Sequence, residues 1–267
     1  MQLSLNRIKQ LSWYYTKISF NDKSRLFLII VWPIIDLIIW GFTTLYLTKT
    51  NLQSNSFIIM ILGAFILWNI TIKAQQEISG QFMQDVFSKN FNNLFVTPLQ
   101  ESEIILSLIF SSLAKISLVF IFLYIFASIF FSVKFANINF LIIILSLINL
   151  FAFGWSLGII ATAFIVRFGH RANFLTWSLA FLAQPFSCVF YPRTILPKLL
   201  YLISWLSPIS YIFEILRNLF FNITSGLPRI ESLIIASILN FTFILISYIF
   251  FKKMLFVAKM KCKLIHL

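Results

Sequence analysis

The sequence predicts an all-α membrane protein with six transmembrane helices, a cytoplasmic helix in the plane of the membrane and external re-entrant half-helices. Three observations support this prediction. The 267 residues are 60% hydrophobic and only 11% charged. Most of the apolar runs approach the length of about 20 residues that a helical span needs. The basic residues gather between these runs, as a topology signal does, and do not form the patch that a nucleic-acid-binding protein would show.

The chain divides into three parts by composition. Residues 1–25 mix basic and apolar side chains and are expected to lie on the cytoplasmic membrane surface. Residues 26–251 form the transmembrane domain, and residues 252–267 form a basic cytoplasmic tail. The predicted spans are residues 26–48, 57–72, 104–133, 138–166, 172–191 and 232–251.

The distribution of Lys and Arg predicts the orientation of these spans. Fourteen of them lie in the first, third, fifth and last non-membrane segments, against six in the other three segments. Because positively charged segments tend to stay in the cytoplasm, both termini are expected there. The two cysteines, Cys188 and Cys262, have neither a disulfide nor a metal-binding spacing.

The stretch 81–103, between the second and third predicted spans, is amphipathic. At helical spacing its apolar side chains fall on one face, and its polar side chains, among them an Asp85–Lys89 pair, fall on the other. Thr97 and Gln100 form a capping box around Pro98 that predicts the start of the next helix. We therefore expect a short in-plane helix ending at residue 95 or 96. It either anchors a loop or acts as a lever for a soluble partner.

Two charges fall in the middle of predicted spans. Asp36 is the only acid and Lys115 the only base at such a position, and both lie at a similar depth from the cytoplasmic side. We expect them to form an intramembrane charge pair, structural rather than proton-relaying. In the fourth span, Gly154 and Gly158 form a GxxxG motif, which permits close helix approach without identifying the neighbour.

The external segment 192–231 is unusually apolar for a loop. Residues 196–206 and 209–221 are apolar stretches, each too short to span, separated at Ser207–Pro208. Proline suits the start of a helix, so Pro197 and Pro208 predict two half-helices. They either re-enter the membrane or form a surface hairpin. Upstream, Gln184–Pro185 should break the fifth span, and downstream Glu214 and Arg217 are expected to pair at i,i+3.

Several enzyme signatures are missing from the sequence. It has no GxxxxGK[ST] loop for ATP, and neither a GxSxG nor an HExxH motif. We therefore expect no enzymatic activity, no catalytic residues, no metal site and no cofactor bound by this chain.

Three parts of the sequence carry a family resemblance. They are the segment Asn92-Asn93-Leu94-Phe95-Val96-Thr97-Pro98-Leu99, the segment from Gln184-Pro185 to Tyr191-Pro192, and Leu196-Pro197 followed by Ser207-Pro208-Ile209-Ser210-Tyr211 and Glu214…Arg217. Together they resemble the membrane (permease) subunit of a type-2 ABC exporter, a class that includes bacterial drug, lipid and polysaccharide exporters. Ser187-Cys188 departs from the family pattern, in which many members carry small residues or glycine.

The resemblance implies a homodimeric or pseudo-dimeric permease in the bacterial cytoplasmic (inner) membrane, docked on two copies of a separate ABC ATPase that binds ATP and magnesium. The coupling helix would contain the ATPase-docking residues Phe87, Asn90, Phe91, Asn92, Asn93 and Leu94. The re-entrant or exit region would contain Gln184, Pro185, Pro197, Pro208, Glu214 and Arg217.

The implied function is ATP-driven export of an amphiphilic substrate, such as a lipid-linked glycan, a lipid or a hydrophobic drug, from the cytoplasm or inner leaflet. The alternative is an ion-coupled secondary transporter. Such a transporter typically shows an internal repeat and several intramembrane charges. The sequence has no evident repeat and one candidate charge pair.

Overall fold

The computed structural model describes residues 4–49, 55–88, 99–131, 140–221 and 229–260, and all regular secondary structure in these ranges is helical. The long helices are α2 (Lys23–Lys49), α3 (Asn55–Phe87), α5 (Glu101–Phe131), α6 (Phe140–Phe168) and α10 (Arg229–Met260). The shorter helices are α1 (Leu5–Asn21), α7 (Leu175–Ala183), α8 (Lys198–Ser204) and α9 (Pro208–Phe221). Short 3-10 helices lie at Gly169–Ala172, Gln184–Ser187 and Arg193–Ile195.

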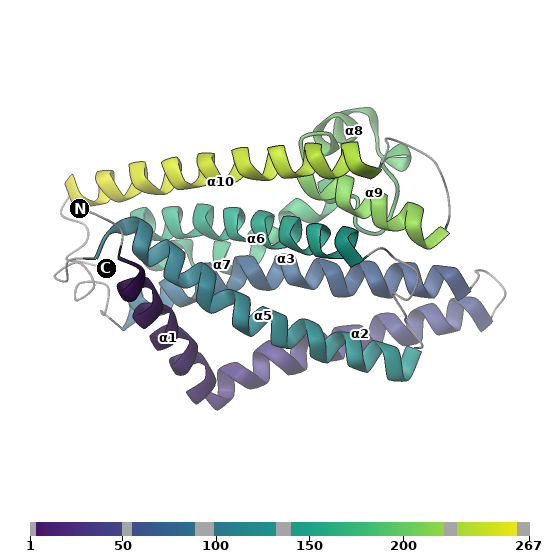
Figure 1. Cartoon of the computed structure of the whole chain (residues 1–267), viewed down its shortest axis with the longest axis horizontal. Helices are drawn as coiled ribbons and strands as arrows, with labels where there is room; N and C mark the ends of the chain where they lie inside the picture. Colours follow the sequence, from purple (N-terminus) through teal and green to yellow (C-terminus); the bar gives the residue numbers. More distant parts are fainter. Residues whose placement is uncertain (1–3, 50–54, 89–98, 132–139, 222–228, 261–267) are drawn as a thin grey trace.

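The long helices run along the long axis of the molecule (Figure 1). α1 crosses this bundle obliquely at the end where both termini lie, and α8 and α9 lie at the opposite end. Helix α1 buries a stripe formed by Ile8, Tyr15 and Ser19, while Leu5 and Trp13 are exposed. The two ends of the bundle are therefore built differently, one around α1 and the other around the α8–α9 pair.

Four helical segments in the described ranges are long and apolar enough to cross a membrane: Ile29–Lys49, Glu101–Phe131, Phe140–Ala172 and Arg229–Met260. They coincide with the predicted first, third, fourth and sixth spans. The α8–α9 pair meets the same criteria only as a unit, and it is bent by 93°. The break lies at Ser207–Pro208, as predicted, so two short helices replace a straight span.

The predicted fifth span, residues 172–191, is not one continuous helix. After the 3-10 helix Gly169–Ala172, α7 has 9 residues and ends at Ala183, where Gln184–Ser187 continues as a 3-10 helix. A helix of this length covers about 14 Å, roughly half of the hydrocarbon core. The break at Gln184–Pro185 is as predicted.

The main correction concerns α3, which runs without interruption from Asn55 to Phe87. The predicted second span and the start of the predicted in-plane helix are one helix. Residues 81–87 form its end, and Phe82, Met83 and Val86 are buried in the bundle instead of lying in the membrane interface. The remainder of the predicted in-plane helix, residues 89–95, lies outside the described residues.

Polar residues in the middle of α3 explain why the sequence predicted that the second span ends at Ile72. Every residue from Met60 to Gln75 is buried, so neighbouring helices supply the partners that lipid cannot provide. The Gln75 side-chain nitrogen donates to the carbonyls of Leu175, at 3.2 Å, and Thr176, at 2.9 Å. The Thr71 hydroxyl donates to the carbonyl of Leu150 at 3.3 Å. The least apolar long helix can therefore occupy the centre.

Helices α3 and α6 meet at the GxxxG motif. A Cβ atom added at Gly154 would lie 2.5 Å from Cβ of Ala74, and one added at Gly158 would lie 2.9 Å from Cβ of Ile78. Both distances are below van der Waals contact, so only glycine permits this approach. The predicted close packing is confirmed, and α3 is the neighbour that the sequence did not identify.

This contact gives a direct test of α3–α6 packing. We expect Gly154→Ala to lower the free energy of unfolding by about 1–3 kcal/mol, because the added methyl overpacks a close contact. Gly80→Ala is the matched control, since its Cβ would lie 3.7 Å from Thr176 Cγ2. Thermal unfolding of the purified variants in detergent measures the difference. Equal melting temperatures for both variants would contradict the packing argument.

Candidate functional site

The end of α3 near the chain termini is held by α1. The hydroxyl of Tyr15 donates to Oδ2 of Asp85 at 2.9 Å, and both side chains are buried. Burial, together with the negative charge of Asp85, raises the pKa of Tyr15 far above its usual value, so the hydroxyl keeps its proton and remains a donor. The last turn of α3, which leads into residues 89–98, is thereby fixed to α1.

Glu103 forms a second junction at the same end. Its carboxylate accepts hydrogen bonds from the backbone N–H groups of Ser4 and Gln100, each at 2.9 Å, and lies 3.6 Å from Nη1 of Arg7. Nearby, Nζ of Lys259 lies 2.7 Å from Glu101. These contacts connect α1 and α10 to the start of α5. They also correct the predicted capping box. α5 begins at Glu101 and not at Pro98, and the side chain of Glu103 caps it by accepting from the N–H of Gln100.

Of the predicted ATPase-docking residues, the structure describes only Phe87. Its side chain is 49% exposed, and its ring meets the His170 ring edge-on with 4.6 Å between centroids. Asn90, Phe91, Asn92, Asn93 and Leu94 lie outside the described residues. Phe87 therefore contrasts with the buried Phe82, Met83 and Val86 that precede it in α3.

A buried ion pair joins α5 to the middle of the bundle. Lys115 of α5 pairs with the carboxylate of Glu77 on α3, and both side chains are buried. The Lys115 Nζ also donates to the hydroxyl of Ser19, near the end of α1, at 3.1 Å. One lysine thus connects three helices.

The predicted Asp36–Lys115 pair is replaced by two separate interactions with α3. Lys115 pairs with Glu77, whereas the cation that interacts electrostatically with Asp36 is Lys73. Lys73 is buried, and its Nζ lies 3.4 Å from the Gln76 side-chain oxygen. The sequence prediction failed because it ended the second span at Ile72 and thus left Lys73 and Glu77 outside the bundle.

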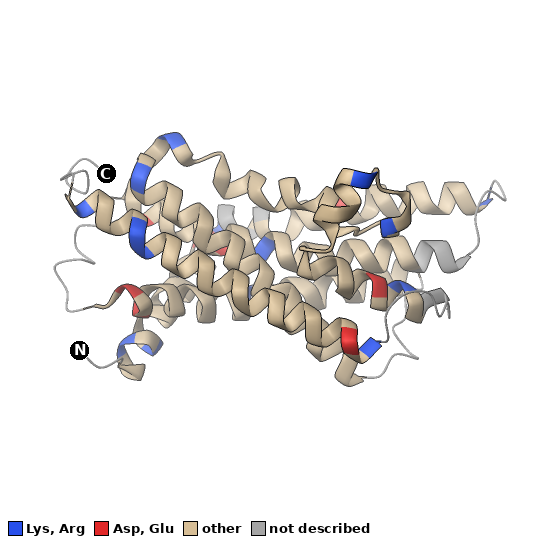
Figure 2. Ribbon diagram, turned by 90° about the horizontal axis from the view of Figure 1, so that it is seen from above, with Lys and Arg blue, Asp and Glu red and all other residues tan. Residues whose placement is uncertain are grey.

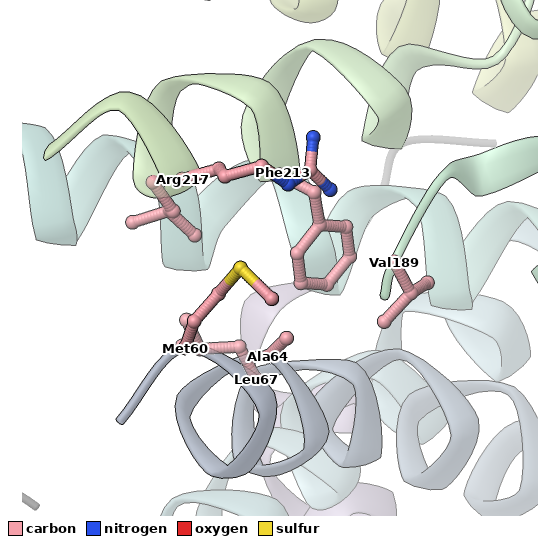
Figure 3. Close-up of a pocket in the computed structure, with 7 residues that line it drawn as sticks. Met60, Ala64, Leu67, Val189, Phe213 and Arg217 are labelled. Carbon is pink, nitrogen blue, oxygen red and sulfur yellow. The ribbon is translucent and has the colours of Figure 1, made fainter. Parts of the chain in front are cut away.

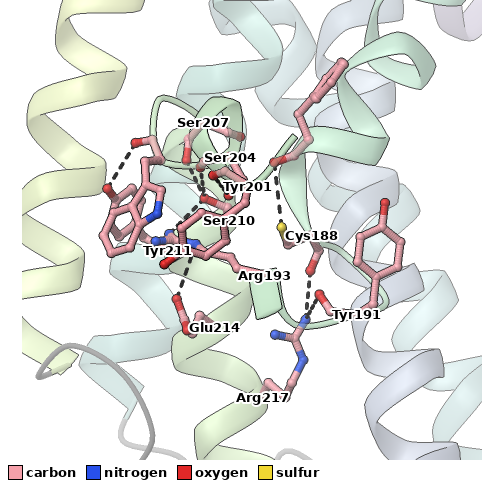
Figure 4. A network of polar contacts seen from close by, with 12 residues as sticks. Cys188, Tyr191, Arg193, Tyr201, Ser204, Ser207, Ser210, Tyr211, Glu214 and Arg217 are labelled. Atoms are coloured by element: carbon pink, nitrogen blue, oxygen red, sulfur yellow. Dashed lines mark hydrogen bonds and ion pairs between the residues drawn. The ribbon is translucent and has the colours of Figure 1, made fainter. Parts of the chain in front are cut away.

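At the opposite end, Arg193 organises the α8–α9 pair (Figure 4). Its guanidinium carbon lies 4.5 Å from the ring centre of Trp205 and 4.0 Å from that of Tyr211. Its Nη2 donates to Ser210 Oγ at 2.9 Å, and its Nε lies 3.5 Å from Oε2 of Glu214. Cation–π contacts and an ion pair on one buried arginine stabilise the 93° bend.

Arg217 attaches α9 to the segment that follows α7. Its Nη2 donates to the carbonyls of Cys188, at 2.7 Å, and Tyr191, at 3.0 Å (Figure 4). The predicted ion pair between Glu214 and Arg217 is therefore wrong. Glu214 forms its ion pair with Arg193 instead. Cys188 has a left-handed backbone with φ of 51°, a conformation that favours glycine. This explains why glycine suits that position in the family pattern.

The family model of the ABC-2 type transporter matches residues 7–221, from α1 to the end of α9. The chain belongs to the ABC-2 type transporter family. No curated protein matches the chain. As a family member, the chain is a membrane transport component, and ABC-2 permeases normally work with an ATPase subunit.

The ABC-2 match covers both ends of the bundle described above. It includes Phe87 at the end of α3 and the residues predicted for the exit region, Gln184, Pro185, Pro197, Pro208, Glu214 and Arg217. Pro197 directly precedes α8, and Pro208 is the first residue of α9, as predicted. Among the described residues, no group of three His, Cys, Asp or Glu side chains is placed to hold a metal ion.

A small cavity lies between α3 and α9 in this ABC-2 chain (Figure 3). Its lining residues are Met60, Ala64, Leu67, Val189, Phe213, Leu216 and Arg217, and its volume is about 10 Å³. This volume is close to the minimum that a single water needs. The cavity is therefore too small for an amphiphilic substrate.

Sequence reasoning missed Glu77, Lys73 and Arg193. A signal was available for the first two, because Lys73 and Glu77 are spaced i,i+4, a spacing that suits ion pairs within a continuous helix. Arg193 had no local signal, since its partners Trp205 and Tyr211 come together only through the bend between α8 and α9.

Proposed function

We propose that this chain is the transmembrane subunit of an ATP-driven ABC exporter that moves an amphiphilic substrate out of the cytoplasm or inner leaflet. The observation that carries the proposal is the ABC-2 family match over residues 7–221. ATP and magnesium would bind to a separate ATPase in two copies. The chain itself would work as a homodimer, or with a related permease, in the bacterial cytoplasmic membrane with both termini inside.

The lever interpretation of the docking segment is supported by the continuity of α3. This helix reaches from the buried middle of the bundle to Phe87, directly before residues 89–98. A displacement of Phe87 would therefore be passed along one continuous helix to Glu77 and Lys73. The junction of Tyr15 with Asp85 would pass the same displacement to α1.

The exit region is the α8–α9 end of the bundle. Two short helices bent by 93° cannot cross the membrane as one straight span. Re-entry into the membrane requires that protein cover their backbone groups, and Arg193 and Arg217 connect them to neighbouring segments. The substrate class stays broad and comprises lipid-linked glycans, lipids and hydrophobic drugs.

The decisive experiment is transport in proteoliposomes that contain this chain and its partner ATPase. We expect efflux of the substrate on addition of ATP and magnesium, and loss of efflux when the ATPase carries a substitution in its phosphate-binding lysine. Ionophores that collapse ion gradients should leave the ATP-dependent efflux unchanged. Transport without the ATPase would overturn the proposal.

The alternative, an ion-coupled secondary transporter, gains one observation from the structure. Lys73, Glu77 and Lys115 are buried in the helical bundle and Asp36 is partly buried, which is more ionisable side chains than the single pair that the sequence suggested. Buried charges are typical of ion pathways. Efflux that depends on an ion gradient and not on ATP would favour this alternative.

The orientation can be tested with reporter fusions. The excess of Lys and Arg in alternate segments predicts that fusions after Thr50 and Asn137 report an external location and that a fusion after Phe168 reports a cytoplasmic one. Alkaline phosphatase and green fluorescent protein give opposite signals on the two sides. A cytoplasmic signal after Asn137 would overturn the assignment of six spans.

A further inference from the structure

Arg167, one residue before the end of α6, has an unusual set of partners. Its Nη1 donates to the sulfur of Met254 on α10 at 3.6 Å, and its guanidinium lies 5.2 Å from the ring centre of Phe168. A thioether is a weak acceptor. In the ranges that the structure describes, no Asp or Glu forms an ion pair with this guanidinium. Most of its five donors are thus available to an anion.

A second cation lies beside this contact between α6 and α10. Phe250 of α10 meets Phe164 of α6 with 5.3 Å between ring centroids, and Met254 meets Arg167. Lys253 is three residues after Phe250 and next to Met254, so it lies on the flank of α10 adjoining these contacts. Its side chain is exposed. Arg167 and Lys253 therefore border one seam with positive charge.

The surface beside these two cations is apolar. Ile246 and Ile249 on α10 are 63% and 64% exposed, and Phe168 of α6 is 49% exposed. Ile246 and Ile249 precede Lys253 by seven and four residues and therefore lie on its side of the helix. The surface beside the α6–α10 contact thus has two cations, Arg167 and Lys253, at one end and an apolar strip, formed by Ile246 and Ile249, that runs toward the middle of the bundle. Lys and Arg residues lie at both ends of the molecule, including this one (Figure 2).

We propose that the α6–α10 seam binds an anionic phospholipid, with its headgroup phosphate on Arg167 and Lys253 and an acyl chain on the strip of Ile246 and Ile249. Charge complementarity supports this ligand, since arginine binds phosphate through paired N–H donors. Basic pockets between transmembrane helices are a known mode of lipid headgroup recognition. None of its residues is among those predicted for ATPase docking or for the exit region, and the proposal does not depend on the proposed export activity.

The experiment is native mass spectrometry of the purified full chain with added phosphatidylglycerol or phosphatidylcholine. We expect Arg167→Gln and Lys253→Gln each to weaken phosphatidylglycerol binding about fivefold, as removal of one cation near a phosphate predicts. Phosphatidylcholine binding should not change. Lys252→Gln is the matched control, because it removes the same charge at the neighbouring residue. Lys252 is seven residues before Lys259 and therefore lies on the side of α10 where Lys259 pairs with Glu101, away from Arg167.

Three outcomes would overturn the proposal. One is equal phosphatidylglycerol binding by the wild type and the Arg167→Gln/Lys253→Gln variant. Another is an equal loss in Lys252→Gln, which would indicate attraction to net charge instead of a site. The third is binding of added inorganic phosphate, in the same measurement, as strong as that of phosphatidylglycerol, because the apolar strip would then contribute nothing. If Arg167→Gln fails to fold, the comparison of Lys253→Gln with Lys252→Gln still decides between these outcomes.

Discussion

Replacing Lys115 with methionine should lower the free energy of unfolding by about 3–5 kcal/mol, the typical effect of removing one partner of a buried ion pair. The variant would remove the ion pair between Lys115 and the buried Glu77 carboxylate, and Ser19 would lose a donor. Both charged side chains are almost entirely buried, at 4% and 6% exposure. Little solvent is therefore available to compensate. Thermal or SDS-induced unfolding of the purified protein measures the effect.

A double variant separates the pair from independent roles. Glu77→Gln/Lys115→Met removes both charges, so it should recover a substantial part of the stability that either single change loses. Lys252→Met serves as the control for loss of one positive charge, because Lys252 is exposed on α10 and should have little effect. If the losses of the two single variants simply add in the double variant, Lys115 and Glu77 do not act as a pair.

The error about Lys115 shows what a sequence can and cannot predict in this fold. Hydropathy located four spans, because each of those helices contains a long, strongly apolar stretch, much of which is not buried inside the bundle. It ended the second span at Ile72, in the middle of α3, because the buried positions that follow include Lys73, Gln75 and Glu77. A helix surrounded by protein need not be apolar, since its neighbours provide partners. High hydropathy therefore identifies helices that face lipid, but it does not identify a helix that is enclosed by other helices.

The α8–α9 end shows the opposite case. Pro197 and Pro208 predicted helix starts correctly, because a missing N–H and a restricted φ act on the local backbone. Arg193 could not be predicted, because its contacts with Trp205 and Tyr211 depend on the 93° bend that brings them together. Local rules thus predicted the breaks, whereas the interactions that stabilise the bend are tertiary.

The largest expected functional effect is from Phe87→Ala/Phe91→Ala. Interfaces tend to draw their energy from a few buried aromatic side chains, and Phe87 is half-exposed at the end of α3 even though the residues before it are buried. If residues 86–95 dock on the ATPase, this variant should remain folded and dimeric but lose association with the ATPase. Loss of two such anchors, at about 2 kcal/mol or more each, corresponds to at least a hundredfold weaker binding.

The control is Phe110→Ala, because Phe110 of α5 is an aromatic residue with nearly the same exposure as Phe87, 52% against 49%, and belongs to neither proposed binding site. Co-purification of the ATPase, its stimulated hydrolysis and substrate efflux should all be lost in the double variant and kept in the control. If the segment only anchors a loop in the membrane interface, the double variant should instead lose folded yield while the folded fraction still binds the ATPase. Full ATPase binding and normal transport by the folded double variant would show that these side chains do not couple the two subunits.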